Sequence, residues 1–73
     1  MDFNEKLREY RKQSELSQGK LAETLNVSRQ AITKWESGNG MPDISNLKAL
    51  SAVFNVSVDE LLSEDLDILM KAS

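Results

Sequence analysis

One short pattern occurs three times along the chain: Leu or Val, then serine, then Leu or Ile four positions after the serine. Serine is a favoured N-cap residue, and an apolar pair on either side of it can close over the first turn of a helix. Each copy therefore predicts the start of a helix. The three copies are Leu16-Ser17 with Leu21, Val27-Ser28 with Ile32, and Val56-Ser57 with Leu61, where Glu60 also completes a capping box.

Two further helices are predicted from other signals. Phe3, Leu7 and Tyr10 are spaced as one face of a helix. Asp43 follows Pro42 and is placed to begin another helix, ahead of the apolar residues Ile44, Leu47, Leu50, Val53 and Phe54. No segment keeps the alternation expected of a strand, so we expect an all-α, compact fold. The five helices are predicted near residues 3–13, 17–25, 28–37, 43–54 and 57–63.

The residue types present limit the chemistry that the chain can perform. It has 73 residues, with neither cysteine nor histidine. The usual zinc, haem and iron–sulfur ligand sets, a thiol nucleophile and an imidazole base are therefore excluded. The neighbouring carboxylates Asp59 and Glu60 are better explained as charges at a helix N-terminus than as catalytic acids. We expect no enzymatic activity, no metal and no cofactor.

Acidic residues gather at the C-terminal end of the chain. The formal net charge is -3, but residues 1–58 hold eight basic and seven acidic side chains. Nucleic-acid binding would therefore depend on a locally basic face. We divide the chain into a domain at residues 1–63 and an acidic tail at 64–73. The tail is expected to be a short helix or a linker, with Leu66, Leu69 and Met70 at helical spacing.

The first ten residues and the length of the apolar runs indicate the cellular compartment of the protein. Residues 1–10 are charged throughout, so no signal peptide is expected. No apolar run approaches the length of a membrane span, and the lack of cysteine fits a reducing compartment. The sequence favours the cytoplasm and no membrane partner.

Residues 18–37 have the pattern of a helix-turn-helix. Ala22 supplies a small side chain where two crossing helices come closest. Asn26 lies at the turn position that requires a positive φ, a conformation that asparagine tolerates. The apolar residues that would form the shared core are Leu21, Leu25, Val27, Ile32 and Trp35.

The chain resembles the Cro/lambda-repressor-like helix-turn-helix group, also called the xenobiotic-response-element type, over residues 3–63. The resemblance implies a compact five-helix DNA-binding domain, with the helix-turn-helix at its second and third helices, that works as a homodimer on a two-fold operator. Two departures are Gly19, where relatives carry a longer polar residue, and Asn39-Gly40-Met41, where many carry Lys or Arg. The motifs that carry the resemblance are Leu16-Ser17-Gln18, Leu21-Ala22, Val27-Ser28-Arg29-Gln30, Ile32-Thr33-Lys34-Trp35-Glu36, Gly38, Pro42-Asp43-Ile44, Asn46-Leu47 and residues 54–62.

In a helix-turn-helix, the second helix enters the major groove and its N-terminal residues meet base edges. Because Ile32 and Trp35 must face inward, the predicted base-contacting residues are Arg29, Gln30, Thr33 and Lys34. Arg and Lys suit guanine, Gln suits adenine, and the methyl of threonine can touch that of thymine. The alternative for this face is an ordinary solvated helix surface.

Two other sets of residues are assigned roles. The predicted phosphate contacts are Gln18, Ser28, Lys20 and Asn39; for Gln18 the role is implied by the resemblance, and for Ser28 helix capping alone is the alternative. The resemblance also implies a structural salt bridge between Arg11 and Glu36 that ties the first helix to the end of the third. Trp35 is expected in the core.

These observations predict a sequence-specific regulator that binds double-stranded DNA, a repressor in preference to an activator. The alternative is a helical protein-interaction module or an antitoxin-like subunit, which should expose an apolar groove in place of a basic face. Dimerisation is expected through the surface around residues 54–62 and the apolar residues of the tail. The sequence is also compatible with a further C-terminal domain or a protein partner.

Overall fold

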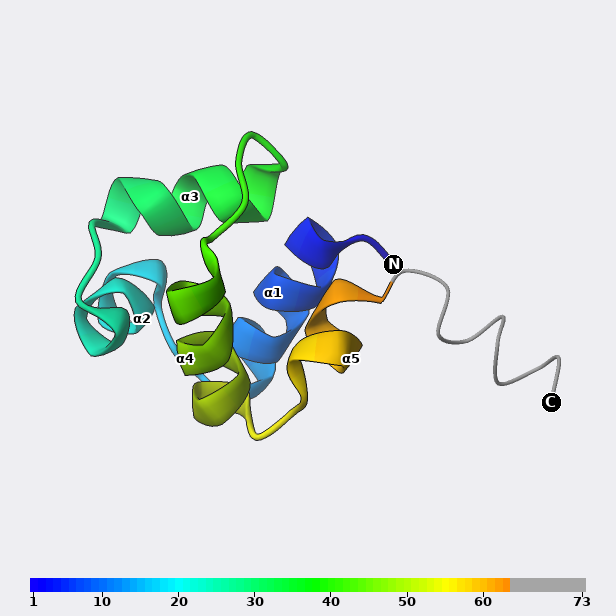
Figure 1. The fold of residues 1–73 in the computed structure, drawn as a ribbon. Helices are drawn as coiled ribbons and strands as arrows, with labels where there is room; N and C mark the ends of the chain where they lie inside the picture. Colours follow the sequence, from blue (N-terminus) through cyan, green and yellow to red (C-terminus); the bar gives the residue numbers. More distant parts are fainter. Residues whose placement is uncertain (64–73) are drawn as a thin grey trace, which may run out of the picture.

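The computed structural model describes residues 1–63 and contains five helices in that part of the chain (Figure 1). Their order and number agree with the sequence prediction. None of these helices is long and apolar enough to cross a membrane. The helices are α1 (Phe3–Gln13), α2 (Gln18–Leu25), α3 (Arg29–Ser37), α4 (Ile44–Phe54) and α5 (Val58–Leu62).

Side-chain caps fix where four of the helices begin. Ser17, Ser28 and Ser57 each accept a hydrogen bond from the backbone N–H three residues later, and Asp43 does the same for α4. These caps have extended backbone conformations, so each of these helices starts one residue later than the predicted range. The cap pattern in the sequence therefore located the helix starts correctly to within one residue.

Left-handed residues end the middle helices. Asn26 has φ 59°, as predicted for the turn between α2 and α3. Gly38 ends α3 with φ 81°, and Asn55 ends α4 with φ 57°. Glycine and asparagine adopt this conformation more readily than other residues, so each supplies a sharp change of direction. Glu15, after α1, also has φ 59°. The sequence did not predict this left-handed conformation, because glutamate does not favour it.

The core lies between all five helices and is built from the predicted apolar positions. Leu7, Leu21, Ile32, Leu50 and Leu61 are fully buried. Ile44, the first residue of α4, does not join this core: its side chain is 59% exposed. Pro42, just before it, is buried instead.

The end of α5 is tied to α1. Lys6 donates hydrogen bonds from Nζ to the carbonyl oxygens of Glu60 and Ser63, satisfying groups left open at the helix end. Tyr10 donates from its hydroxyl to Glu60 Oε1 at 3.2 Å, and its ring stacks on Phe54. The predicted capping box is thus half formed: Ser57 caps Glu60 N–H, but the Glu60 carboxylate bonds Tyr10.

The apolar residues of the predicted dimer surface, residues 54–62, mostly pack within the domain itself. Leu61 is fully buried and Phe54 is half-buried against Tyr10, which leaves Leu62, 40% exposed, as the large exposed apolar side chain of α5. The tail residues Leu66, Leu69 and Met70 lie outside the described residues.

Candidate nucleic-acid interface

Helices α2 and α3 pack against each other across a short turn (Figure 1). Val27 N–H donates to the carbonyl oxygen of Ala22 at 2.9 Å, which closes the end of α2. Ala22 is 3% exposed at this junction, where a larger side chain would have no room. The left-handed Asn26 then redirects the chain into α3. This is the local geometry of a helix-turn-helix.

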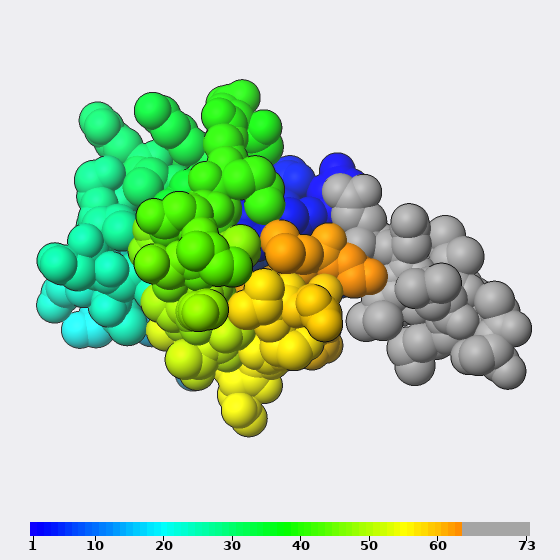
Figure 2. Space-filling model, viewed as in Figure 1, coloured from blue at the N-terminus to red at the C-terminus, as the bar shows by residue number. Residues whose placement is uncertain are grey.

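Helix α3 has one buried face and one exposed face. Ile32, Trp35 and Glu36 are buried, which fixes the rotation of the helix about its axis. The predicted base-contacting residues lie on the other face and are all exposed: Arg29, Gln30, Thr33 and Lys34. In the space-filling view, side chains of α3 and of the loop after it, drawn in green, stand out from one edge of the molecule (Figure 2). The domain therefore offers a convex, polar helix to a partner.

A buried polar network holds α3 in this orientation. Arg11 Nε lies 2.5 Å from Glu36 Oε2, and Arg11 Nη2 donates to Glu36 Oε1 at 3.1 Å. Gln18 Nε2 also donates to Glu36 Oε1, at 3.1 Å. Arg11 further donates to the carbonyl oxygen of Leu16, so it joins α1, the following loop and α3. The hydrogen bond to Glu36 is the main cause that raises the pKa of the Arg11 guanidinium.

Sequence reasoning missed Arg8 as a member of this region. Its Nη2 donates to the backbone carbonyl oxygen of Glu36 at 3.0 Å, at the C-terminal end of α3, where cations are favoured. Arg8 stands one helical turn before Arg11, and this spacing is the signal that could have found it. A shallow hollow lies beside the two arginines, lined also by Gln18, Thr33, Glu36 and Ser37.

Gln18 and Thr33 join α2 to the exposed face of α3. Thr33 Oγ1 lies 3.2 Å from Gln18 Oε1, and the same hydroxyl lies 3.2 Å from the carbonyl oxygen of Arg29. The Gln18 amide is therefore engaged inside the protein at both ends. One hydrogen on its Nε2 is left for an external acceptor such as a phosphate.

The other predicted phosphate contacts surround the same face. Ser28 Oγ accepts from Ala31 N–H at 3.2 Å, so helix capping is an observed role for it. Lys20 is exposed, with Nζ 3.8 Å from Glu23 Oε1. Asn39 is exposed in the loop after α3 and donates from Nδ2 to Ser37 Oγ at 3.1 Å. The structure thus brings Gln18 and Thr33 into contact, while Lys20 and Asn39 form separate local contacts.

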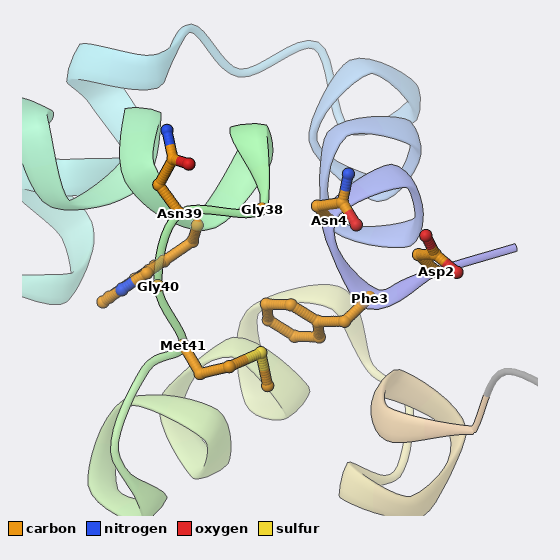
Figure 3. A pocket seen from close by; sticks show the side chains of 8 residues that line it. Asp2, Phe3, Asn4, Gly38, Asn39, Gly40 and Met41 are labelled. Atoms are coloured by element: carbon orange, nitrogen blue, oxygen red, sulfur yellow. The ribbon is translucent and has the colours of Figure 1, made fainter.

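A larger hollow of about 420 Å³ lies between the start of α1 and the loop after α3 (Figure 3). The side chains of Phe3 and Met41 point toward each other across it, whereas Asn39 extends away along α3. Met41 is 57% exposed. The loop that bounds this hollow holds no basic residue between Lys34 and Lys48, as the sequence shows.

Comparisons with known proteins agree with this geometry. The family model described as helix-turn-helix matches residues 7–61. The HTH-type transcriptional activator BcrR of Enterococcus faecalis is 56% identical over 63 residues, which are 86% of this chain and 31% of that protein. The chain spans 31–56% of the length of three such curated relatives.

Two solved structures share the fold and are described as complexes. The P22 c2 repressor protein, crystallised with a synthetic operator, has a TM-score of 0.83 and 35% identity. The alignment covers 89% of this chain and 98% of that one. SinR, a master regulator for biofilm formation crystallised with DNA, has a TM-score of 0.77 and 32% identity, covering 84% and 98% of the two chains. With a family model matched across all five helices and solved relatives of the same fold, this chain belongs to the helix-turn-helix family.

Proposed function

We propose that this chain is the DNA-binding domain of a transcriptional regulator, which binds double-stranded DNA by placing α3 in the major groove. The observation that carries the proposal is the rotation of α3: Ile32, Trp35 and Glu36 are buried, and four polar residues are exposed opposite them. Those residues are Arg29, Gln30, Thr33 and Lys34, which can pair with base edges. The structures of the P22 c2 repressor with a synthetic operator and of SinR with DNA support the same role.

The proposal assigns phosphate contacts to the ends of the helices beside α3. The free N–H groups at the start of α2, together with the remaining Gln18 Nε2 hydrogen, are suited to one backbone phosphate. Lys20 adds an exposed positive charge within the first turn of α2. Ser28 and Asn39 are further candidates: the Ser28 hydroxyl caps α3 as an acceptor and keeps its own hydrogen, and Asn39 Nδ2 keeps one hydrogen. These contacts position the domain without selecting a sequence.

Repression is the proposed direction of regulation. A domain bound at a promoter can exclude other proteins from the same DNA without any further contact. Among the relatives, BcrR is named as an activator and P22 c2 as a repressor. A reporter gene under a promoter that carries the preferred site should fall in expression when the protein is present; a rise would assign activation instead.

A homodimer in the cytoplasm is the proposed working form. One helix-turn-helix buries a small interface, and two copies on a two-fold site place their α3 helices in successive major-groove faces about 34 Å apart.

The alternative of a protein-interaction module predicts an apolar groove at the functional face. The large exposed apolar side chains of residues 1–63 are instead Met1, Met41, Ile44 and Leu62, none of them on α3.

The experiment that tests the proposed function is selection of bound duplexes from a random library at stated salt. The proposal predicts recovery of a preferred sequence, with much weaker binding to unrelated duplexes at the same salt. Recovery of no preferred sequence would contradict it, and a protein partner captured with higher affinity than any duplex would favour the interaction-module alternative.

A further inference from the structure

Thr33 is on the exposed face of α3, yet its hydroxyl is already engaged within the protein. Oγ1 lies 3.2 Å from Gln18 Oε1 and 3.2 Å from the Arg29 carbonyl oxygen. A hydroxyl has one hydrogen to donate, and both of these neighbours are acceptors. Any acceptor on a base edge would therefore have to compete with two acceptors that the fold itself supplies.

The direction of the Gln18 amide follows from Glu36. An ionised carboxylate only accepts hydrogen bonds, so the amide nitrogen of Gln18 must face it, at 3.1 Å. The amide oxygen then faces Thr33. Glu36 is itself 4% exposed and held by two hydrogen bonds from Arg11. A continuous series of hydrogen bonds thus runs from the buried ion pair to the surface of α3.

This series determines which part of Thr33 is presented to a partner. Threonine in a helix divides between two rotamers, because its hydroxyl can bond a carbonyl of the preceding turn. The hydrogen bond that Thr33 Oγ1 donates to Gln18 Oε1 favours the rotamer in which the hydroxyl faces α2. The methyl group diverges from the hydroxyl at the same carbon. Because Thr33 is an exposed residue, a hydroxyl held toward α2 leaves the methyl as the group that can meet a partner.

We propose that Thr33 is a specificity-determining residue that selects thymine through its methyl group, with Gln18 as the positioning residue that holds the hydroxyl away from the DNA. The inference depends on the proposed insertion of α3 into the major groove. The C5-methyl of thymine is the apolar group that a base pair presents there, and a side-chain methyl packs against it. From the sequence, this methyl is already a group that can touch thymine, and the contact with Gln18 adds a reason why the methyl and not the hydroxyl is presented.

The test uses the preferred duplex from the library selection, with each thymine replaced singly by deoxyuridine, which lacks the methyl. At one thymine per half-site the wild-type protein should lose about fourfold in affinity, the equivalent of burying one carbon group at ~0.8 kcal/mol. Thr33→Val keeps a methyl and should keep this loss. Thr33→Ser keeps the hydroxyl and should bind the thymine and deoxyuridine duplexes equally at that position.

The positioning role of Gln18 has a separate readout. Gln18→Ala should reduce the deoxyuridine effect at the same thymine, because the Thr33 hydroxyl then keeps only the Arg29 carbonyl oxygen as an acceptor and its side chain is held less firmly. Lys20→Ala is the matched control: it removes a charge from the same helix and should lower affinity for both duplexes by the same factor. The quantity compared is therefore the ratio of the affinities for the thymine and deoxyuridine duplexes, not either affinity alone.

Several results would overturn the proposal. If Thr33→Val removes selectivity while Thr33→Ser retains it, the hydroxyl contacts the base. If no thymine shows a methyl effect that depends on residue 33, the methyl contact is absent. A full deoxyuridine effect in Gln18→Ala would overturn the positioning role alone. Failure of the selection to yield a preferred duplex is distinct from these results: it would overturn the proposed function, and this inference with it.

Discussion

Arg11 of α1 and Glu36 of α3 form an ion pair with Nε and Oε2 2.5 Å apart, and their side chains are 13% and 5% exposed. Glu36 accepts from Gln18 as well, and Arg11 donates to the Leu16 carbonyl oxygen. Both charges are therefore compensated by several hydrogen bonds as well as by each other. The pair connects the first helix to the end of the helix that we propose enters the major groove.

Removing one member of this pair should be strongly destabilising. Glu36→Ala leaves the Arg11 guanidinium without its partner in a nearly buried site, with an expected loss of about 3–5 kcal/mol in unfolding free energy. Glu23→Ala is the matched control, because Glu23 is an exposed carboxylate 3.8 Å from Lys20 and should contribute within ~0.5 kcal/mol. Thermal and urea unfolding of the two variants give the comparison. Equal losses would show that the buried pair does not stabilise the domain.

Lys20→Ala should weaken binding to all duplexes by a similar factor. The proposed contact is with a phosphate, which is present at every sequence. Titrations at several salt concentrations should also show the slope of log affinity against log salt falling by about 1. A loss confined to the preferred duplex would instead assign Lys20 to a base, and an unchanged slope would remove it from the interface.

Deprotonation of Tyr10 should make the domain less stable at alkaline pH. Burial, followed by the charge and hydrogen bond of Glu60, raises the pKa of the Tyr10 phenol above its usual value near 10. Because the folded state holds this proton more tightly, the stabilisation from Tyr10 is complete only at pH values below the pKa of the phenol in the unfolded chain. It is lost as pH rises through the folded pKa. Unfolding free energies measured from pH 8 upward should therefore fall more steeply for the wild type than for Tyr10→Phe; parallel curves would show that folding does not raise the pKa of Tyr10.

Truncation after Ser63 tests the proposed role of the tail in dimerisation. The shortened chain retains the five helices and the core, so it should fold. We expect it to dimerise more weakly in sedimentation experiments, and to lose affinity for a duplex with two half-sites while keeping its affinity for one. Unchanged self-association would place the interface within residues 1–63, and a monomer at high concentration with DNA present would contradict the dimer itself.

The helix starts were predictable from local chemistry, whereas contacts between helices were not. Ser17, Ser28, Asp43 and Ser57 act on N–H groups three residues away, so their effect is written in the nearby sequence. Asn26 was predictable for the same reason. Glu60 shows the limit: its spacing from Ser57 predicts a capping box, but Tyr10, 50 residues away in the sequence, takes its carboxylate.

The exposed face of α3 could be predicted from its apolar spacing, because Ile32 and Trp35 define the opposite face. The Gln18–Thr33 contact could not, since the direction of each side chain depends on how α2 and α3 cross. Ile44 shows another limit. Its spacing from Leu47 matches one face of a helix, but its position at the first turn of α4 leaves it exposed.

Base contact by α3 is the central claim, and repeating the library selection with Arg29→Ala and Gln30→Ala tests it most directly. Each variant should lose about 1–3 kcal/mol on the wild-type duplex and less on random DNA. In the newly selected sequences, the preference should relax at one position per half-site and persist at the others: a guanine for Arg29 and an adenine for Gln30. If both variants recover the wild-type sequence with unchanged preference at every position, the N-terminal residues of α3 do not contact the bases, and the account is wrong.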